Sequence, residues 1–255
     1  WAQFLAVAQQ LTARPVFGFA FSEQRAMHIL PWLWSYGGRL VNADFQESMI
    51  ARPESLAALR WLLDLTFVHK VSPQAADLQR AGVESAWELL KLGQLGMYYV
   101  SWYRRIPYAV AEPPTGPQQA ATSLGWSPDE SPAVFSLVSD SGDPDGAWSF
   151  LSWWTSRDVQ REFQAHTSLS YGGVPARQSL VREQPARYSA GTIAALASAR
   201  AAPLHPTWRE LVRAFDAGLT PLWESKQDVA AAMATVAQQQ NAILDRWWRK
   251  QRGSP

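Results

Sequence analysis

The chain has 255 residues, of which 47% are hydrophobic and 18% are charged, a balance typical of a folded globular protein rather than a disordered one. Its formal net charge of +1 provides no broad electrostatic field for nucleic acid or for a membrane surface. The absence of cysteine excludes a disulfide framework and any thiolate metal site, and no apolar run approaches the roughly 20 residues of a membrane-spanning helix.

The first hundred residues alternate between helical and extended patterns. Helices are predicted where apolar residues recur at three- and four-residue spacing, as Phe4, Ala8 and Leu11 do near the start. Gly37 and Gly38 end the second helix, because glycine adopts the left-handed closing conformation at little cost. The predicted helices are 1–12, 24–36, 53–69 and 83–92, and the predicted strands are 13–21 and 97–102.

The rest of the chain is mainly helical. The prolines and the glycine of 113–117 mark its clearest loop. The predicted elements after this loop are a strand at 133–138 and helices at 144–155, 156–166, 178–188, 193–200, 206–217 and 227–248. Because helices outnumber the strands and separate them along the chain, the predicted class is α/β with a mainly parallel sheet.

Motifs of catalysis and of cofactor binding are missing from the sequence. It has neither a Walker phosphate loop nor a Gly-x-Gly-x-x-Gly turn, and its four histidines are scattered outside any His-Glu-x-x-His frame. The segment 125–129 starts like a nucleophile elbow but lacks the final glycine. A pair of Asp or Glu residues for glycoside cleavage stays open, since such a pair need only meet in space. We therefore expect a protein that is not an enzyme and that holds no cofactor and no metal.

Aromatic residues favour a binding role. The chain contains 14 tryptophans, more than an ordinary core requires. Trp102 ends the predicted strand 97–102, which follows a glycine turn at Gly93. In an open α/β sheet, ligands bind at the carboxyl ends of the strands. An indole at that place offers a flat apolar face and one N–H donor.

Seven short motifs follow one another in a familiar order. They are WAQFL at 1–5, LWSYGG at 33–38, PESLAAL at 53–59, VSP at 71–73, GQLGM at 93–97, AWSFL at 147–151 with TS at 155–156, and GVPAR at 173–177. In this order the chain resembles the extracellular solute-binding proteins of bacterial ABC importers, in the family-1 group that includes maltose- and other sugar-binding proteins. The motifs cover nearly the whole chain.

The resemblance implies a two-lobe periplasmic-binding-protein architecture of type II, with a ligand cleft that closes by hinge motion. It also implies that the family's opening segment, which builds most of the first lobe, is missing here. We therefore expect 1–126 to be the first part of the C-terminal lobe, 127–168 an excursion into the N-terminal lobe, and 169–255 the helical second part of the C-terminal lobe. Gly96 stands where the family usually has alanine, so we expect looser packing against its strand.

The resemblance implies a function outside the cytoplasm, in the periplasm or the extracellular space. We expect a monomer that binds a mono- or oligosaccharide and delivers it to the permease subunits of an ABC transporter. Nucleic acid is not an expected partner, and membrane contact is expected only through a lipid anchor in the missing N-terminal segment. Two alternatives stay open: a non-sugar solute such as a glycerophosphodiester, for which Arg104 and Arg105 would matter, and a carbohydrate-active enzyme.

Aromatic side chains are the main candidates for the binding site. A sugar ring presents C–H groups that an aromatic face can cover, and hydroxyl groups that polar atoms can bind. Trp102 and Trp208 match positions where the family has tryptophans that face the cleft. The other candidates are Trp126 near the predicted hinge, Tyr171 and Gly173 in a glycine-containing loop, and Trp34 on an apolar helix. Packing within the fold stays open as the alternative for each of these residues, and it is the favoured interpretation for Trp34.

Overall fold

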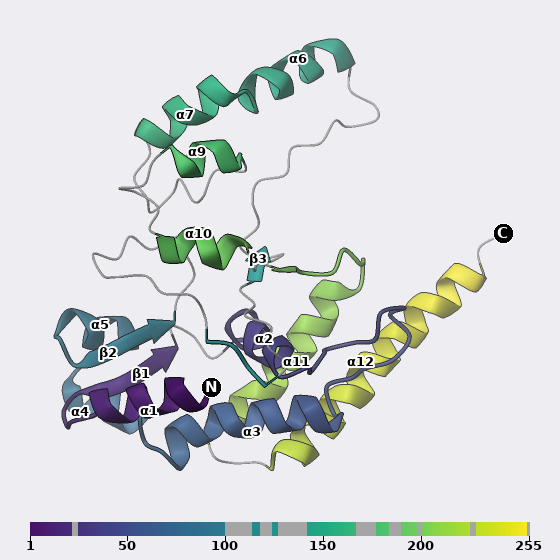
Figure 1. Cartoon of the computed structure of the whole chain (residues 1–255). Helices are drawn as coiled ribbons and strands as arrows, with labels where there is room; N and C mark the ends of the chain where they lie inside the picture. Colours follow the sequence, from purple (N-terminus) through teal and green to yellow (C-terminus); the bar gives the residue numbers. More distant parts are fainter. Residues whose placement is uncertain are drawn as a thin grey trace. The chain divides into compact units, whose positions relative to one another are not determined.

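The computed structural model of the chain (Figure 1) describes residues 1–21, 25–99, 114–117, 124–126, 142–166, 177–183, 190–197, 200–224 and 228–253. The chain forms two compact units. Unit 1 comprises Trp1–Val100, Pro113–Gly125 and Ser198–Pro255, and unit 2 comprises Ser101–Glu112 and Trp126–Ala197. The lobe boundaries at 126 and 168 stay a prediction.

The elements of unit 1 begin with α1 (Ala2–Leu11), β1 (Phe17–Phe21), α2 (Ala26–Ser35), α3 (Pro53–Phe67), α4 (Ala75–Ala81), α5 (Ala86–Lys91) and β2 (Leu95–Tyr99). They continue with β4 (Arg200–Ala201), α11 (Trp208–Trp223) and α12 (Val229–Arg252). The short strand β3 (Leu124–Trp126) pairs with β4. Unit 2 contains α6 (Pro144–Trp154), α7 (Arg157–His166), α9 (Gln178–Arg182) and α10 (Ala190–Ala197).

The predicted helices are confirmed within the described residues, with several differences in extent. Helix α10 starts three residues before the predicted 193–200, Arg200 belongs to β4, and α12 runs to Arg252, past the predicted end at 248. Helix α4 was not predicted. It follows the break at Pro73 because the side chains of Gln74 and Asp77 form a capping box at its start. Helix α9 ends at Arg182, earlier than predicted. Helix α11 runs to Trp223, past the predicted end at 217. The predicted strand at 133–138 lies outside the described residues.

Gly218 explains the wrong prediction for the end of α11. A glycine at this place suggests a helix end, but here it allows α12 to approach. A Cβ atom at Gly218 would lie 2.2 Å from the Cγ2 atom of Val236. The helix continues because Leu219 and Leu222 are buried beyond this glycine. The close contact therefore serves the packing of α11 on α12.

Strands β1 and β2 form a parallel pair, which places the ends of both strands at one edge. Phe17 lies opposite Leu95, and Phe21 lies opposite Tyr99. All five residues of β1 are buried, as expected for a strand covered on both faces. Helix α1 contacts both strands, and α5 contacts β2 (Figure 1). This arrangement fixes the carboxyl ends of the two strands relative to α1 and α5.

Helix α1 lies very close to β1 at Gly18. The Gly18 N–H donates to the Thr12 Oγ1 atom at 3.0 Å, and the Thr12 hydroxyl donates to the Ala8 carbonyl oxygen at 2.7 Å. Gly96 faces the same helix from β2, where a Cβ atom would lie 3.0 Å from the Leu11 Cδ1 atom. The expectation of loose packing at Gly96 is wrong, because the Leu11 side chain already occupies the space next to it.

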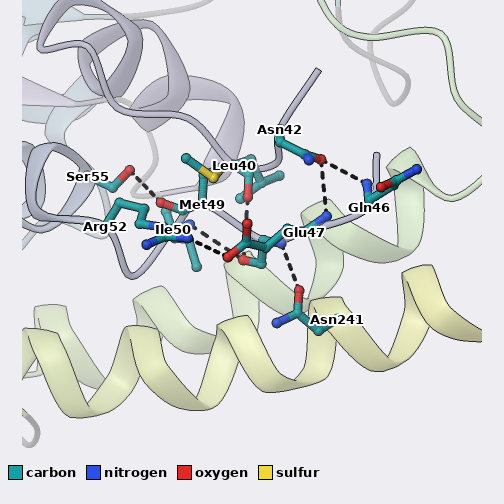
Figure 2. A network of polar contacts seen from close by, with 10 residues as sticks. Leu40, Asn42, Gln46, Glu47, Met49, Ile50, Arg52, Ser55 and Asn241 are labelled. Carbon is teal, nitrogen blue, oxygen red and sulfur yellow. Dashed lines mark hydrogen bonds and ion pairs between the residues drawn. The ribbon is translucent and has the colours of Figure 1, made fainter. Parts of the chain in front are cut away.

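Polar contacts attach the loop between α2 and α3 to α11 and α12, and Figure 2 shows the one with Asn241 of α12. The Ser48 hydroxyl donates to the Gln240 Oε1 atom at 2.6 Å, and the Ser48 N–H donates to the Asn241 Oδ1 atom at 2.7 Å. The Gln240 side-chain amide donates to the Leu211 carbonyl oxygen at 2.9 Å. Gln240, which is fully buried, thus joins the loop, α11 and α12.

The same loop packs on His205, the residue three positions before α11. The Phe45 ring lies parallel to the imidazole of His205 with 4.1 Å between ring centroids, and Trp247 lies 5.5 Å from it on α12. The His205 Nδ1 atom lies 2.8 Å from the Thr207 hydroxyl oxygen and 3.3 Å from the Thr207 backbone nitrogen. Burial lowers the pKa of His205 below its usual range. The fold therefore favours the neutral imidazole.

We expect the protein to lose stability when the pH falls below about 6.5, the pKa of histidine in an unfolded chain. Below that value, histidine in the unfolded chain binds a proton more readily than folded His205 does. The contribution of neutral His205 to the free energy of unfolding is therefore complete above pH 6.5 and declines as the pH falls below it. The measurement is urea unfolding at pH 5.5 and 7.5, compared with His205→Phe, which keeps an aromatic ring and does not titrate. An identical pH dependence in both proteins would contradict this role of His205.

In unit 2, α6 and α7 carry an aromatic cluster. Trp154 of α6 contacts Phe163 of α7 edge to face, with 5.3 Å between ring centroids. The guanidinium of Arg177 donates twice to the Thr155 carbonyl oxygen at the turn between these helices. Large apolar side chains on α6 are exposed; they are Trp148, Phe150 and Trp153.

Candidate ligand-binding site

The candidate site lies at the carboxyl ends of β1 and β2. Because the strands are parallel, their last residues, Phe21 and Tyr99, are neighbours at this edge of the pair. Their rings meet edge to face, with 5.8 Å between centroids and 72° between planes. The carboxyl edge of a parallel sheet is where ligands bind in open α/β folds. The two strands thus bring aromatic side chains to the expected place.

Two tryptophans from helices extend this aromatic edge. Trp32 of α2 lies 5.6 Å from Tyr99 and 5.7 Å from Phe21, measured between ring centroids. Trp223, the last residue of α11, lies 6.3 Å from Phe21. His28, one helical turn before Trp32, meets Tyr99 edge to face at 6.2 Å. We call Phe21, Trp32, Tyr99 and Trp223 the strand-end aromatic cluster.

Helix α2 holds Trp32 in position because it is buried along nearly its whole length. Its buried residues are Ala26, His28, Ile29, Leu30, Pro31, Trp32, Leu33 and Ser35. At the start of α2, the Ala26 N–H donates to the Asp216 Oδ1 atom of α11 at 2.6 Å. A carboxylate at this end satisfies a free amide and complements the helix dipole. This bond ties α2 to the helix that carries Trp223.

The cluster combines apolar faces with polar atoms. The Nε1 atoms of Trp32 and Trp223 are buried, and neither has a hydrogen-bond partner among the described residues. A buried donor without a partner costs about 1 to 3 kcal/mol, so a hydroxyl group or a water molecule near either indole would be stabilised. Burial raises the pKa of the Tyr99 hydroxyl well above its usual range, which keeps this group neutral. The cluster suits a ligand with C–H faces and hydroxyl groups.

The structure describes only part of the site predicted from the sequence. Trp34 is half-buried on α2, and Trp208 is 3% exposed at the start of α11, where its ring lies 6.5 Å from Phe45. The backbone of Trp126 belongs to β3, but its side chain lies outside the described residues. Trp102, Tyr171 and Gly173 also lie outside them.

Sequence reasoning missed the strand-end aromatic cluster. Phe21 carried a usable signal, since it ends the predicted strand 13–21. Tyr99 was expected inside the predicted strand 97–102, whose last residue was Trp102, whereas β2 is Leu95–Tyr99. Trp32 and His28 are four residues apart and share a helix face, which also marked them as a pair. Trp223 gave no such signal, because α11 was predicted to end before it.

Among the described residues, no group of three or more His, Cys, Asp or Glu side chains is able to hold a metal ion. Within the same ranges, no helix combines the length and apolar character needed to cross a membrane.

Comparisons with known proteins give the fold and the family. Residues 1–161 match the family model described as bacterial extracellular solute-binding protein. No curated protein matches in the sequence comparison. Among solved structures, the sugar-binding protein MalE from the phytopathogen Xanthomonas citri has a TM-score of 0.76 at 15% identity, covering 100% of this chain and 65% of its own.

Two other solved structures resemble the chain to a similar degree. The maltose/maltodextrin-binding domain MalE from Bdellovibrio bacteriovorus, bound to maltotriose, has a TM-score of 0.69 at 16% identity, covering 98% of this chain and 66% of its own. An ABC substrate-binding protein from Listeria monocytogenes, in complex with cycloalternan, has a TM-score of 0.67 at 17% identity, covering 97% of this chain and 63% of its own. The chain spans about two thirds of the length of these proteins, and its fold is the α/β architecture of two-lobe periplasmic binding proteins. It belongs to the bacterial extracellular solute-binding protein family.

Proposed function

We propose that the chain binds a neutral mono- or oligosaccharide at the carboxyl ends of β1 and β2, and that it delivers this ligand to the permease of an ABC importer. The strand-end aromatic cluster is the observation that carries the proposal. Tyr99 and Trp223, the two half-buried rings of the cluster, offer ring surface to the C–H groups of a sugar, and the buried rings of Phe21 and Trp32 pack next to them. The indole N–H of Trp223 offers a donor to the hydroxyl groups. The ligands in the names of the similar structures, maltotriose and cycloalternan, belong to the same chemical class.

Trp102 is proposed as the main stacking residue. It follows Tyr99, the last residue of β2, by three positions. We also propose Trp126, Tyr171, Gly173 and Trp34 as further ligand contacts. Trp208, the other predicted contact, is buried near Phe45 at the opposite end of α11 from Trp223, and packing explains it without a ligand.

Family membership is the basis of our proposals on where the protein works and which partner it has. We propose that the protein works as a monomer in the periplasm or outside the cell, with a lipid anchor on the complete protein. The permease receives the ligand from the cleft after the lobes open. Residues 1–126 and 169–255 are proposed to belong to the C-terminal lobe, and 127–168 to the N-terminal lobe.

The proposal is tested by thermal unfolding with a panel of mono- and oligosaccharides that includes maltose and maltotriose. A ligand that binds the native state raises the melting temperature. A rise with a saccharide supports the proposal. Stabilisation only by a glycerophosphodiester or an organic acid would overturn the sugar assignment. Chromatography of the same samples detects cleaved sugar, and turnover would favour the carbohydrate-active enzyme instead.

Replacing Trp102 by alanine is expected to weaken binding of the saccharide found in this panel by about 1 to 2 kcal/mol, or roughly 5- to 30-fold in Kd. The loss arises because the stacking face disappears while the strand-end aromatic cluster is unchanged. Isothermal titration calorimetry measures the change. Trp148→Ala is the matched control, since Trp148 is 62% exposed on α6 and outside the cluster. Unfolding of Trp102→Ala without a specific loss of affinity would assign Trp102 to packing.

A further inference from the structure

The last two turns of α12 carry a dense cluster of positive charge. Between Asp245 and Arg252 the helix has four cations and one anion. Arg246, Arg249 and Lys250 share one exposed face, because they are three and four residues apart. The opposite face packs inward through Gln240 and Leu244. These turns, yellow in Figure 1, extend beyond α3 and α11.

Aromatic side chains border this positive face. Trp247 and Trp248 are both half-buried. The Trp248 Nε1 atom donates to the Phe45 carbonyl oxygen at 2.6 Å, and Trp247 meets the His205 ring edge to face. Both indoles are therefore held by the loop and the segment next to them, with part of each ring left in contact with solvent.

Leu204 adds an exposed apolar side chain beside the same face. It is 89% exposed, although it directly precedes His205, which contacts Phe45 and Trp247. Nothing in unit 1 covers it within the described residues. An exposed leucine next to a half-exposed indole and three cations is the composition of a surface that enters the interface of a lipid bilayer.

We propose that the end of α12, with Arg246, Arg249, Lys250, Arg252, Trp247 and Leu204, binds the surface of an anionic phospholipid bilayer. The cations are attracted to phosphate groups of the lipids, while Leu204 and the Trp247 ring enter the region between headgroups and acyl chains. The net charge of +1 gives no indication of this surface, because acidic residues elsewhere in the chain balance its positive charge. This contact differs from a lipid anchor and is independent of the sugar proposal.

The cations at this end of α12 also have a structural explanation. Positive side chains in the last turn complement the helix dipole, and Arg246 forms an ion pair with Glu210 at 2.5 Å. That explanation leaves Leu204 without a role. Membership in an extracellular family favours a membrane surface over nucleic acid as the anionic partner. The two explanations differ in their prediction for vesicle binding.

Co-sedimentation with vesicles tests the proposal. The chain is mixed at low salt with vesicles of phosphatidylglycerol and phosphatidylcholine, and with vesicles of phosphatidylcholine alone. We expect binding to the anionic vesicles only, weakening as salt screens the charges. The triple variant Arg249→Gln, Lys250→Gln and Arg252→Gln is expected to lower the partition coefficient at least about tenfold.

A matched triple variant removes the same charge elsewhere in unit 1. Arg60→Gln, Lys70→Asn and Lys91→Gln change exposed cations of other elements, and asparagine suits the positive φ of residue 70. This variant is expected to bind vesicles like the parent chain. Equal losses in the two triple variants would show general electrostatic attraction and would overturn the assignment to α12.

The apolar part of the surface has its own control. Leu204→Ser is expected to weaken vesicle binding without any change of charge, whereas Leu92→Ser, at a leucine that is 58% exposed on another element, is not. Absence of binding to anionic vesicles at low salt would overturn the proposal. So would binding to heparin in solution, lost in the α12 variant, without any binding to vesicles.

Discussion

Replacing Gly18 by alanine is expected to lower the free energy of unfolding by about 3 kcal/mol or more, at the upper end of the range for an overpacked core. A Cβ atom at this position would lie 1.9 Å from the carbonyl oxygen of Ala8 and 2.7 Å from the Thr12 Oγ1 atom. The Ala8 oxygen belongs to the backbone of α1, so no side-chain rotation can relieve this shorter contact. Helix α1 would have to move away from β1, and the bonds through Thr12 would break.

Alanine substitutions at two other glycines provide a comparison for the effect of Gly18→Ala. Gly96→Ala is expected to cost less, because the atoms it would meet at 3.0 and 3.1 Å belong to the Leu11 side chain, which can shift. Gly142→Ala is expected to change stability by less than about 0.5 kcal/mol, since a Cβ atom there meets nothing within 4 Å. Urea unfolding of the three variants gives the order of their free energies of unfolding. A Gly18→Ala variant as stable as Gly142→Ala would contradict the close packing of α1 on β1.

Gly18 and Gly96 show where sequence analysis reaches its limit. Periodicity predicted α1, β1 and their order, because spacing of apolar residues is a local signal. The approach of the helix to the strand is not local, and a glycine in a strand pattern is compatible with several causes. The family comparison at Gly96 even suggested loose packing, whereas the Leu11 side chain fills that space.

The candidate site was predictable to a similar extent. A parallel pair of strands and an aromatic carboxyl edge were expected from the sequence, and β1 and β2 confirm the pairing. The predicted residues came from family positions and from their places in loops and helices, and the ring contacts of the edge add Phe21, Trp32 and Trp223, which were not predicted. These contacts depend on how α2 and α11 pack at the strand ends, which spacing along the chain does not encode.

Gln240→Ala is expected to lower the free energy of unfolding by about 3 kcal/mol, because it combines a cavity with broken buried hydrogen bonds. The amide of Gln240 accepts from the Ser48 hydroxyl and donates to the Leu211 carbonyl oxygen. Gln240→Leu fills most of the volume and removes only the bonds, so its smaller loss measures the polar part. Urea unfolding, monitored by tryptophan fluorescence, gives both values.

Gln239→Ala is the matched control for this change. Gln239 is the neighbouring glutamine of α12 and is exposed, so its replacement by a good helix former is expected to leave stability within about 0.5 kcal/mol of the parent. Equal stability of the Gln239 and Gln240 variants would contradict the network. Because Gln240 holds α11, and Asp216 of α11 holds the start of α2, loosening this network is also expected to disturb Trp32 in the strand-end aromatic cluster. The polar network at one end of unit 1 and the aromatic edge at the other are thus linked through a single helix.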